Sequence, residues 1–158
     1  MKRLILFIVT LCIGISFTSC TKNTVSKVST GNPLLENSTI VTSKIGNTEE
    51  FIKSLEKSGY KTKTIKQDNN RFLSGTLTLI AINETNIGIY EYKNNQEMEQ
   101  DSKTISSDAS MIGYTIYDWK ATPHFYKKGN IIVSYFGDNK EIIETLEKLL
   151  GQQFAGMA

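Results

Sequence analysis

The sequence is poor in the residues that most often build catalytic centres, metal sites and disulfides. It has one His, one Trp, two Pro and two Cys among 158 residues. A single His disfavours a transition-metal site, because such sites usually draw several His or Cys ligands. Glycine-rich phosphate-binding loops and the Gly-x-Ser-x-Gly turn of many hydrolases are also absent. We therefore expect neither a metal ion nor a cofactor.

The start of the chain has the features of a bacterial secretion signal. Residues 1–19 combine a basic start, an apolar run over positions 4–17 and small residues at the end, which is the pattern of a signal peptide. The run is shorter than the ~20 residues that a membrane-spanning helix needs. Phe17 to Cys20 resemble a lipobox, with Phe17 where Leu is usual. The sequence therefore predicts lipidation of the Cys20 thiol and cleavage before this residue.

This lipid anchor determines the predicted location. The processed chain would begin at Cys20 and be held in the cell membrane or the outer membrane, exposed outside the cytoplasm, because two acyl chains suffice for stable attachment. Cys12 lies in the removed segment, so the processed chain has no second Cys for an internal disulfide. The alternative is a plain signal peptide followed by a coincidental Cys.

Basic and acidic side chains balance in the processed chain. The full sequence has 18 Lys and Arg against 16 Asp and Glu, and Lys2 and Arg3 fall within the signal. A balanced charge gives no general attraction to phosphate backbones. We therefore expect no nucleic-acid partner.

After the signal, the chain divides into two parts. Residues 20–45 are polar and include a Gly-Asn-Pro cluster, which predicts a flexible tether or, alternatively, an irregular arm packed on the domain. Residues 46–158 have the length and the apolar content of one domain.

This domain is predicted to have an α+β fold. Asn47 and Asn94 are each followed three residues later by Glu, as at helix starts, and Asp138 is predicted to cap the last helix in the same way. The β-rich segments, among them residues 114–119, are joined by short turns, which favours antiparallel pairing. Two hairpins are predicted, one with its turn over residues 83–86 and one with its turn at Lys128, Gly129 and Asn130. The predicted order is α-β-β-β-α-β-β-β-α, as a two-layer sandwich with helices on one face of the sheet.

The C-terminal third carries a distinctive run of residues. Trp119 is followed by PHFYKKGNIIV at positions 123–133, by YFG at positions 135–137 and by QFAG at positions 153–156. Together with the lipobox, this pattern resembles a family of small bacterial lipoproteins of uncharacterised function. The resemblance implies an exported, lipid-anchored protein and carries no activity with it.

His124 is the first candidate for a catalytic base because the chain has no other His. A Ser-His-Asp arrangement would be built on His124, with Asp118 as the orienting carboxylate. A carboxylate pair such as Asp118 with Glu91 is a second route to hydrolysis. The alternative for His124 is a structural role at the start of a strand, with its ring bonded to the backbone.

Aromatic residues are concentrated in the same part of the chain. The candidate binding residues are Tyr114, Tyr117, Trp119, His124 and Tyr126. Exposed Tyr and Trp side chains dominate many binding surfaces for peptides and sugars. The alternative is that these rings fill the core, because aromatic residues favour strands in any case.

These observations favour a non-enzymatic binding or interaction module of the bacterial envelope, anchored in the membrane through Cys20. Its expected partners, besides the membrane, are an envelope protein, a peptide or a glycan. A small envelope hydrolase that uses His124 or a carboxylate pair is the alternative. A third interpretation is a structural subunit that adds its polar edge strand, residues 60–66, to the sheet of a partner.

Overall fold

The computed structural model describes residues 44–65 and 72–157. These residues form three helices, α1 (Thr48–Lys57), α2 (Asn95–Ser102) and α3 (Lys140–Leu150). Their strands are β1 (Thr62–Ile65), β2 (Thr76–Ile82), β3 (Thr85–Glu91), β4 (Met111–Ile112), β5 (Thr115–Ile116), β6 (Pro123–Lys128), β7 (Ile131–Phe136) and β8 (Ala155–Gly156). The protein has an α+β fold, as the sequence predicted.

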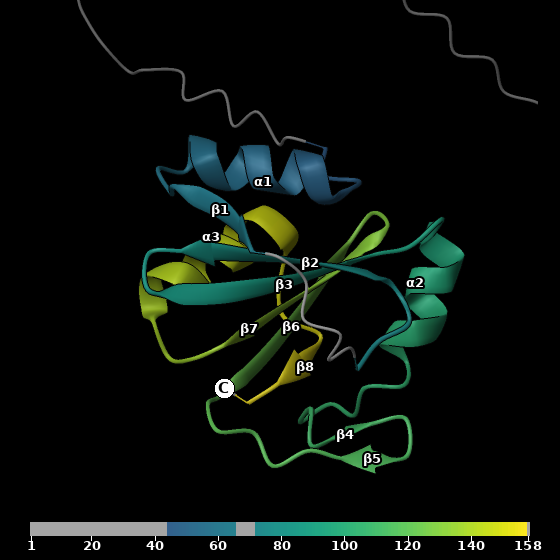
Figure 1. Ribbon diagram of the computed structural model, residues 1–158. Coiled ribbons are helices and arrows are strands. Elements are labelled where there is room, and N and C mark those ends of the chain that lie inside the picture. Colours follow the sequence, from purple (N-terminus) through teal and green to yellow (C-terminus); the bar gives the residue numbers. More distant parts are fainter. Residues whose placement is uncertain (1–43, 66–71, 158) are drawn as a thin grey trace, which may run out of the picture. The chain divides into compact units, whose positions relative to one another are not determined.

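Six strands form one antiparallel sheet in the order β1-β2-β3-β7-β6-β8, and β4 pairs with β5 in a separate small sheet. β2 and β3 are joined by a two-residue turn, as are β6 and β7, so both predicted hairpins are confirmed. The two hairpins meet in the middle of the sheet, where β3 pairs with β7 and Ile89 lies opposite Val133. Figure 1 shows this arrangement, with α1 above the sheet and the β4–β5 hairpin at the other end of the domain.

One face of the sheet is covered by α1 and α3. Phe51 and Leu55 of α1 and Leu146 of α3 pack there and are at most 1% exposed. The strand residues beneath them are Ile80, Ile82, Ile87, Ile89, Tyr126, Ile131, Val133 and Tyr135. The apolar residues of α1 and α3 recur at helical spacing, so each helix buries one stripe against this face.

The opposite face is covered by α2 and by the chain that follows it. Met98 of α2, Ile105, Ala109 and Ile112 pack over this face and are buried. The rings that complete this second cluster are Phe72, Tyr90, Tyr92, Tyr117, Trp119, Phe125, Phe136 and Phe154. The expectation of helices on one face therefore holds for α1 and α3, whereas α2 packs with the other cluster.

The helices begin at asparagine residues whose side chains satisfy free backbone amides. Oδ1 of Asn47 accepts a hydrogen bond from the Glu50 amide at 2.9 Å, and Oδ1 of Asn94 accepts one from the Glu97 amide at the same distance. Both predicted caps are confirmed. The cap of α3 is Asn139, which accepts from the amides of Glu141 and Ile142, and not Asp138 as predicted.

The segment predicted as a sheet strand over residues 114–119 is instead a short hairpin followed by an irregular stretch. Oδ1 of Asp108 accepts hydrogen bonds from the Ser106 hydroxyl at 2.6 Å and from the Ser110 amide at 3.0 Å. These bonds form a tight turn ahead of β4, and Gly113, with a φ of 60°, lies between β4 and β5. Local pairing of β4 with β5 therefore replaces pairing with the main sheet.

The first described residues pack against the β6–β7 turn. The Asn130 amide donates a hydrogen bond to the Gly46 carbonyl at 2.9 Å. A Cβ on Gly129 would lie 2.5 Å from the Gly46 Cα, and Gly129 has a φ of 58°, so glycine is required there. Ile45 is 3% exposed in the core, and the domain therefore includes this last residue of the predicted tether. The predicted signal peptide and positions 20–43 lie outside the described residues.

Within the described ranges, none of the helices combines the length and the apolar character that a membrane crossing requires.

Candidate functional site

His124 is buried, with both ring nitrogens close to polar atoms. The residue is 4% exposed. Its Nδ1 lies 2.7 Å from Oε1 of Gln153, and its Nε2 lies 3.0 Å from the carbonyl oxygen of Gly137. The ring also stacks on Tyr135 at a centroid distance of 5.7 Å. The partner of Nδ1 is thus an amide and not Asp118, and this engaged, buried ring is badly placed to take a proton from a substrate.

Tyr126 is also inside the domain, on the face covered by α1 and α3. It is 0% exposed, and its hydroxyl has no hydrogen-bond partner among the described residues. Burial, helped by the negative charge of Glu147, raises the pKa of Tyr126 to about 12. Tyr126 and His124 therefore belong to the packing of the domain and not to its surface.

Tyr117 and Trp119 lie together on the opposite face and remain half-buried. Their rings stack with a centroid distance of 4.6 Å and an interplanar angle of 6°. The indole Nε1 of Trp119 donates a hydrogen bond to the Ala109 carbonyl at 2.7 Å, which fixes the ring. Phe72 and Phe136 contact Trp119 from the sheet side. The pair is thus part of the second cluster and also reaches the surface.

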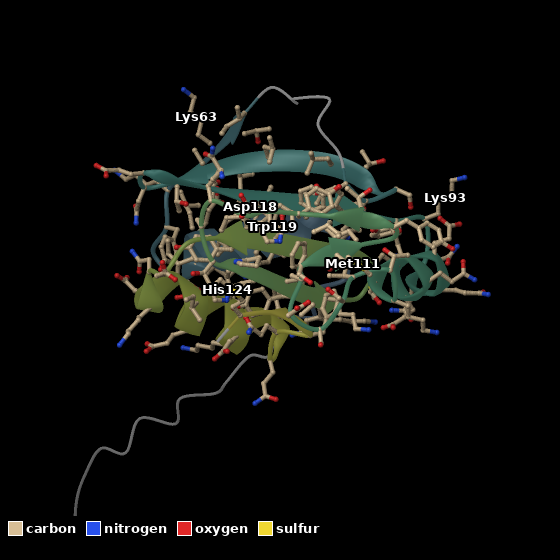
Figure 2. The ribbon with its side chains drawn as sticks, turned by 90° about the horizontal axis from the view of Figure 1, so that it is seen from below. Lys63, Lys93, Met111, Asp118, Trp119 and His124 are labelled. Carbon is tan, nitrogen blue, oxygen red and sulfur yellow. The ribbon has the colours of Figure 1, made fainter. Side chains whose placement is uncertain are left out.

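A pocket of about 380 Å³ opens beside this pair. It is lined by residues 117–123 together with Asp138 and Met157, and is called here the aromatic pocket. Its charged groups are exposed, and Nζ of Lys120 lies 3.1 Å from Oδ2 of Asp118. Figure 2 shows Asp118 and Trp119 on the side of the domain seen from below. The aromatic pocket offers two ring surfaces, an ion pair and a further carboxylate to a ligand.

Tyr114 lies outside the aromatic pocket, in the turn between β4 and β5. It is 105% exposed, and its neighbours Ile116 and Met111 are 77% and 42% exposed. The structure thus separates the five predicted binding residues into three places. Two are in the core, two are in the aromatic pocket, and Tyr114 is alone at the hairpin tip.

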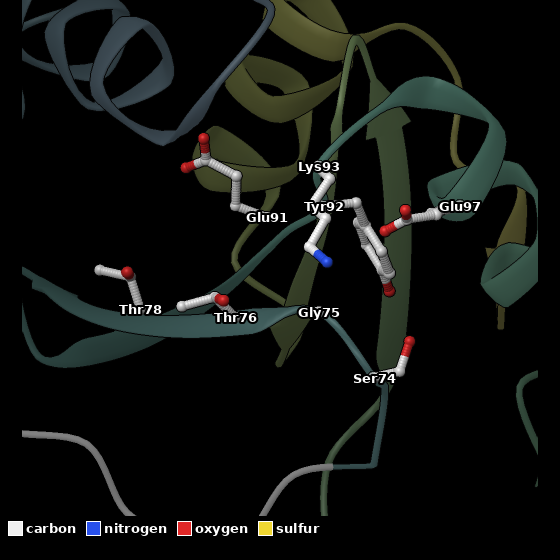
Figure 3. Close-up of a pocket in the computed structure, with 8 residues that line it drawn as sticks. All are labelled: Ser74, Gly75, Thr76, Thr78, Glu91, Tyr92, Lys93 and Glu97. Atoms are coloured by element: carbon white, nitrogen blue, oxygen red, sulfur yellow. The ribbon is translucent and has the colours of Figure 1, made fainter.

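Glu91 lies in a different pocket from Asp118, so the predicted carboxylate pair is not brought together. This second pocket, of about 370 Å³, lies between the start of β2, the end of β3 and the start of α2. We call it the polar pocket. Its lining residues are Ser74, Gly75, Thr76, Thr78, Glu91, Tyr92, Lys93 and Glu97. In the view of Figure 3, Lys93 lies between Glu91 and Glu97, with the two Thr side chains on β2 nearby.

A hydrogen-bonded corner closes one end of the polar pocket. The Tyr92 hydroxyl donates to Oδ2 of Asp101 at 2.6 Å, and the same oxygen accepts from the amide and hydroxyl of Ser74. Burial and the Asp101 carboxylate raise the pKa of Tyr92. The Tyr92 phenol therefore stays protonated, and its hydrogen bond to Asp101 connects the end of β3 to α2.

Sequence reasoning missed the polar pocket because its residues come from separate elements with no motif among them. The only available signal was the alternation of Thr76 and Thr78 with apolar residues in β2, which places two hydroxyls on one face of a strand. Over residues 44–65 and 72–157, the structure contains no cluster of three His, Cys, Asp or Glu side chains suited to a metal ion.

Comparison of the chain with known protein families, with curated proteins and with solved structures finds no match.

Proposed function

We propose that this chain is a lipid-anchored protein of the bacterial envelope that binds a peptide or glycan component without transforming it. The proposed location at the membrane is supported by residues 17–20, which resemble a lipobox. The binding role is supported by one observation above the others, the stacked Tyr117–Trp119 pair that lines the aromatic pocket.

The chemistry of the aromatic pocket suits recognition. Flat rings contribute large contact areas, and their few side-chain torsions cost little entropy when a ligand orders them. Trp119 is already fixed by its hydrogen bond to Ala109, so this part of the pocket is organised before a ligand arrives. The exposed Asp118, Lys120 and Asp138 can bond the hydroxyls or amides of a sugar or a peptide.

The two groups that the sequence suggested as catalytic base and orienting carboxylate, His124 and Asp118, are both engaged by other groups. His124 is buried and occupied by Gln153 and the Gly137 carbonyl. The Asp118 carboxylate is exposed and forms an ion pair with Lys120, with 3.1 Å between Oδ2 and Nζ. Binding without turnover is therefore the function that the geometry favours.

The anchor is tested by replacing the Cys that receives it. Cys20→Ser should stop processing or release the protein from the membrane fraction, whereas Cys12→Ser, within the signal, should leave both unchanged. Membrane retention and the size of the product on a gel report the outcome. Normal processing and retention of the Cys20→Ser protein would contradict the proposed anchor.

The binding site is tested with soluble peptidoglycan fragments, which contain both sugars and peptides. Trp119 is the only Trp in the chain, so its fluorescence reports binding in the aromatic pocket. Tyr117→Ala should weaken binding about tenfold or more, because truncating a ring at a hot spot costs about 2 kcal/mol or more and about 1.4 kcal/mol is tenfold. Tyr114→Ala, outside the pocket, is the matched control and should bind normally. Equal affinities of the two variants would contradict this site.

The polar pocket supports a second candidate, an envelope hydrolase that uses Glu91 and Glu97. The observation in its favour is that these two carboxylates line one pocket, as the acid and base of a glycoside hydrolase do. Release of reducing ends from peptidoglycan by the wild-type protein, and its loss in both Glu91→Gln and Glu97→Gln, would favour this function over the proposed one.

A further inference from the structure

The β4–β5 hairpin ends in a small apolar surface that the rest of the domain does not cover. Met111 and Ile116 are cross-strand partners, so their side chains point to the same side of the small sheet. Tyr114 lies in the turn between them, and all three are exposed. Ile112, with the opposite orientation, is 6% exposed in the core. The hairpin is thus fixed to the domain by one side and presents the other to its surroundings.

The hairpin tip carries no charge. Residues 109–117 contain no Asp, Glu, Lys, Arg or His, in a chain of which 22% of the residues are charged. An uncharged tip can leave water without the large cost of desolvating an ion. Of its two aromatic residues, Tyr117 is half-buried and Tyr114 is fully exposed, and Tyr is enriched where proteins meet the boundary between lipid and water.

Several backbone groups of the hairpin are already bonded within the protein. The Met111 carbonyl accepts a hydrogen bond from the Ser106 amide at 2.9 Å, and the Gly113 amide donates to the Thr104 carbonyl at 2.8 Å. The Tyr117 amide donates to the Ser110 carbonyl at 2.9 Å. Because unbonded backbone groups are what makes entry into lipid costly, these bonds lower the cost for the hairpin.

From these features we propose that the tip of the β4–β5 hairpin inserts into the surface of the lipid bilayer that holds the protein. The inserted side chains are those of Met111, Tyr114 and Ile116. The inference rests on the lipid anchor proposed for Cys20 and adds a second contact to it. A single lipid attachment leaves the domain free to rotate, whereas a second apolar contact fixes which side faces the membrane.

The length of chain before the domain allows this contact. Residues 20–43 separate the anchor from the first described residue, and at ~3.4 Å per residue they span at most about 80 Å. A domain of this size has a radius of gyration of about 13 Å. The tip lies at the end of the domain away from α1, where the described chain begins (Figure 1). The segment is therefore long enough to let the tip reach the same membrane surface.

The experiment attaches residues 20–158 to vesicles chemically, so that it does not depend on lipidation in the cell. Cys20 is the only Cys in this chain and couples to a maleimide lipid in phosphatidylcholine vesicles. Two variants carry a tryptophan probe, Y114W at the hairpin tip and K63W on the exposed part of β1. The Trp119 fluorescence of the protein without a probe is subtracted from that of each variant. The remaining fluorescence, which comes from the probe, is measured on vesicles with and without lipids brominated near the headgroups.

The proposal predicts that the probe of Y114W shifts to shorter wavelength on vesicles and that brominated lipids quench most of its emission. The probe of K63W should stay unquenched. High salt should leave the quenching unchanged because the tip is uncharged, and adding I116D to Y114W should abolish it. Ile116 is 77% exposed, so this change should leave the fold intact.

Two results would overturn the proposal. Equal quenching of Y114W and K63W, or none in either, would remove the membrane contact and leave the anchor at Cys20 untouched. A blue shift of Y114W that appears without vesicles and grows with protein concentration would show that a second copy of the chain covers the tip instead.

Discussion

The two faces of the sheet are packed in different ways. The face under α1 and α3 is filled mainly by Ile, Leu and Val side chains, whereas the opposite face is filled largely by aromatic rings. The first face is covered by two helices with regular apolar stripes. The second is covered by α2 and an irregular segment, residues 103–122, which has no repeating stripe.

This difference shows how an irregular segment can cover a core. The segment has no periodic stripe, and its Tyr117 and Trp119 pack on rings that other parts of the chain supply. A single aromatic ring can bury about 150–250 Å². Specific hydrogen bonds then fix the segment, as those of Asp108 to Ser106 and Ser110 and that of Trp119 to Ala109 do. Part of the aromatic surface stays accessible, and it is there that the aromatic pocket lies.

The largest effect is expected on the aliphatic face. Leu146 is fully buried between α3 and the sheet, so Leu146→Ala should lower the free energy of unfolding by about 2–5 kcal/mol. Glu144→Ala, on the exposed side of the same helix, should change it by less than about 0.5 kcal/mol. Denaturant unfolding measures both, and a loss below about 0.5 kcal/mol for Leu146→Ala would contradict the packing described for α3.

A smaller effect is expected on the aromatic face. Trp119 is half-buried and loses a stacked ring and one hydrogen bond on truncation, so Trp119→Ala should cost about 2–3 kcal/mol, less than a fully buried ring. Tyr114→Ala in the same segment should be neutral because Tyr114 is exposed. Thermal unfolding separates the two, and equal midpoints would mean that the Trp119 ring does not support the segment.

The two faces also differ in whether a buried tyrosine hydroxyl has a hydrogen-bond partner. The Tyr92 hydroxyl bonds Asp101 at 2.6 Å, so Tyr92→Phe should cost about 1–2 kcal/mol by leaving the carboxylate with one partner fewer. Asp101→Asn in the Tyr92→Phe background should then cost less than it does alone. Additive losses in this double-mutant cycle would show that the hydrogen bond does not contribute to stability.

The smallest effect at neutral pH is expected for Tyr126→Phe. The Tyr126 hydroxyl is buried without a partner, so removing it should be neutral or stabilise the domain by up to about 1 kcal/mol. A loss of more than about 1 kcal/mol, measured by denaturant unfolding, would imply that the hydroxyl makes a bond in solution.

The same substitution should change the response to alkali. A tyrosine in the unfolded chain has a pKa of about 10, and the pKa of Tyr126 in the domain is about 12. The unfolded state therefore loses this proton first, and the wild-type protein loses stability as the pH rises from about 10 to about 12. Tyr126→Phe lacks this contribution, so its advantage over the wild type should grow across that range.

Local features of the sequence predicted much of the fold. The caps at Asn47 and Asn94 and the turn at Gly129 act over three or four residues, and each was found where the sequence placed it. The hairpins β2–β3 and β6–β7 were predicted from the short turns between their strands. The structure of residues 114–119 could not be predicted this way. Their composition favours a strand, but β5 pairs with β4, which follows the turn at Asp108, and not with the main sheet.

The candidate site was harder to predict because it depends on contacts distant in sequence. The side-chain partner of His124 is Gln153. Glu91 meets Thr76 through the pairing of β2 with β3, and Glu97 of α2 lines the same pocket. Composition predicted that aromatic residues would matter. It could not separate Trp119, at a pocket, from Tyr126, in the core, because strands favour aromatic residues whether these are buried or exposed.

The proposed function depends on a lipid anchor at Cys20, which would change the mass of the protein's first peptide. The protein is expressed in a bacterium, purified from the membrane fraction and digested, and its N-terminal peptide is measured by mass spectrometry. If the anchor is present, the peptide begins at Cys20 and carries the added mass of a diacylglyceryl group. A peptide that begins elsewhere, or that begins at an unmodified Cys20, would contradict this anchor.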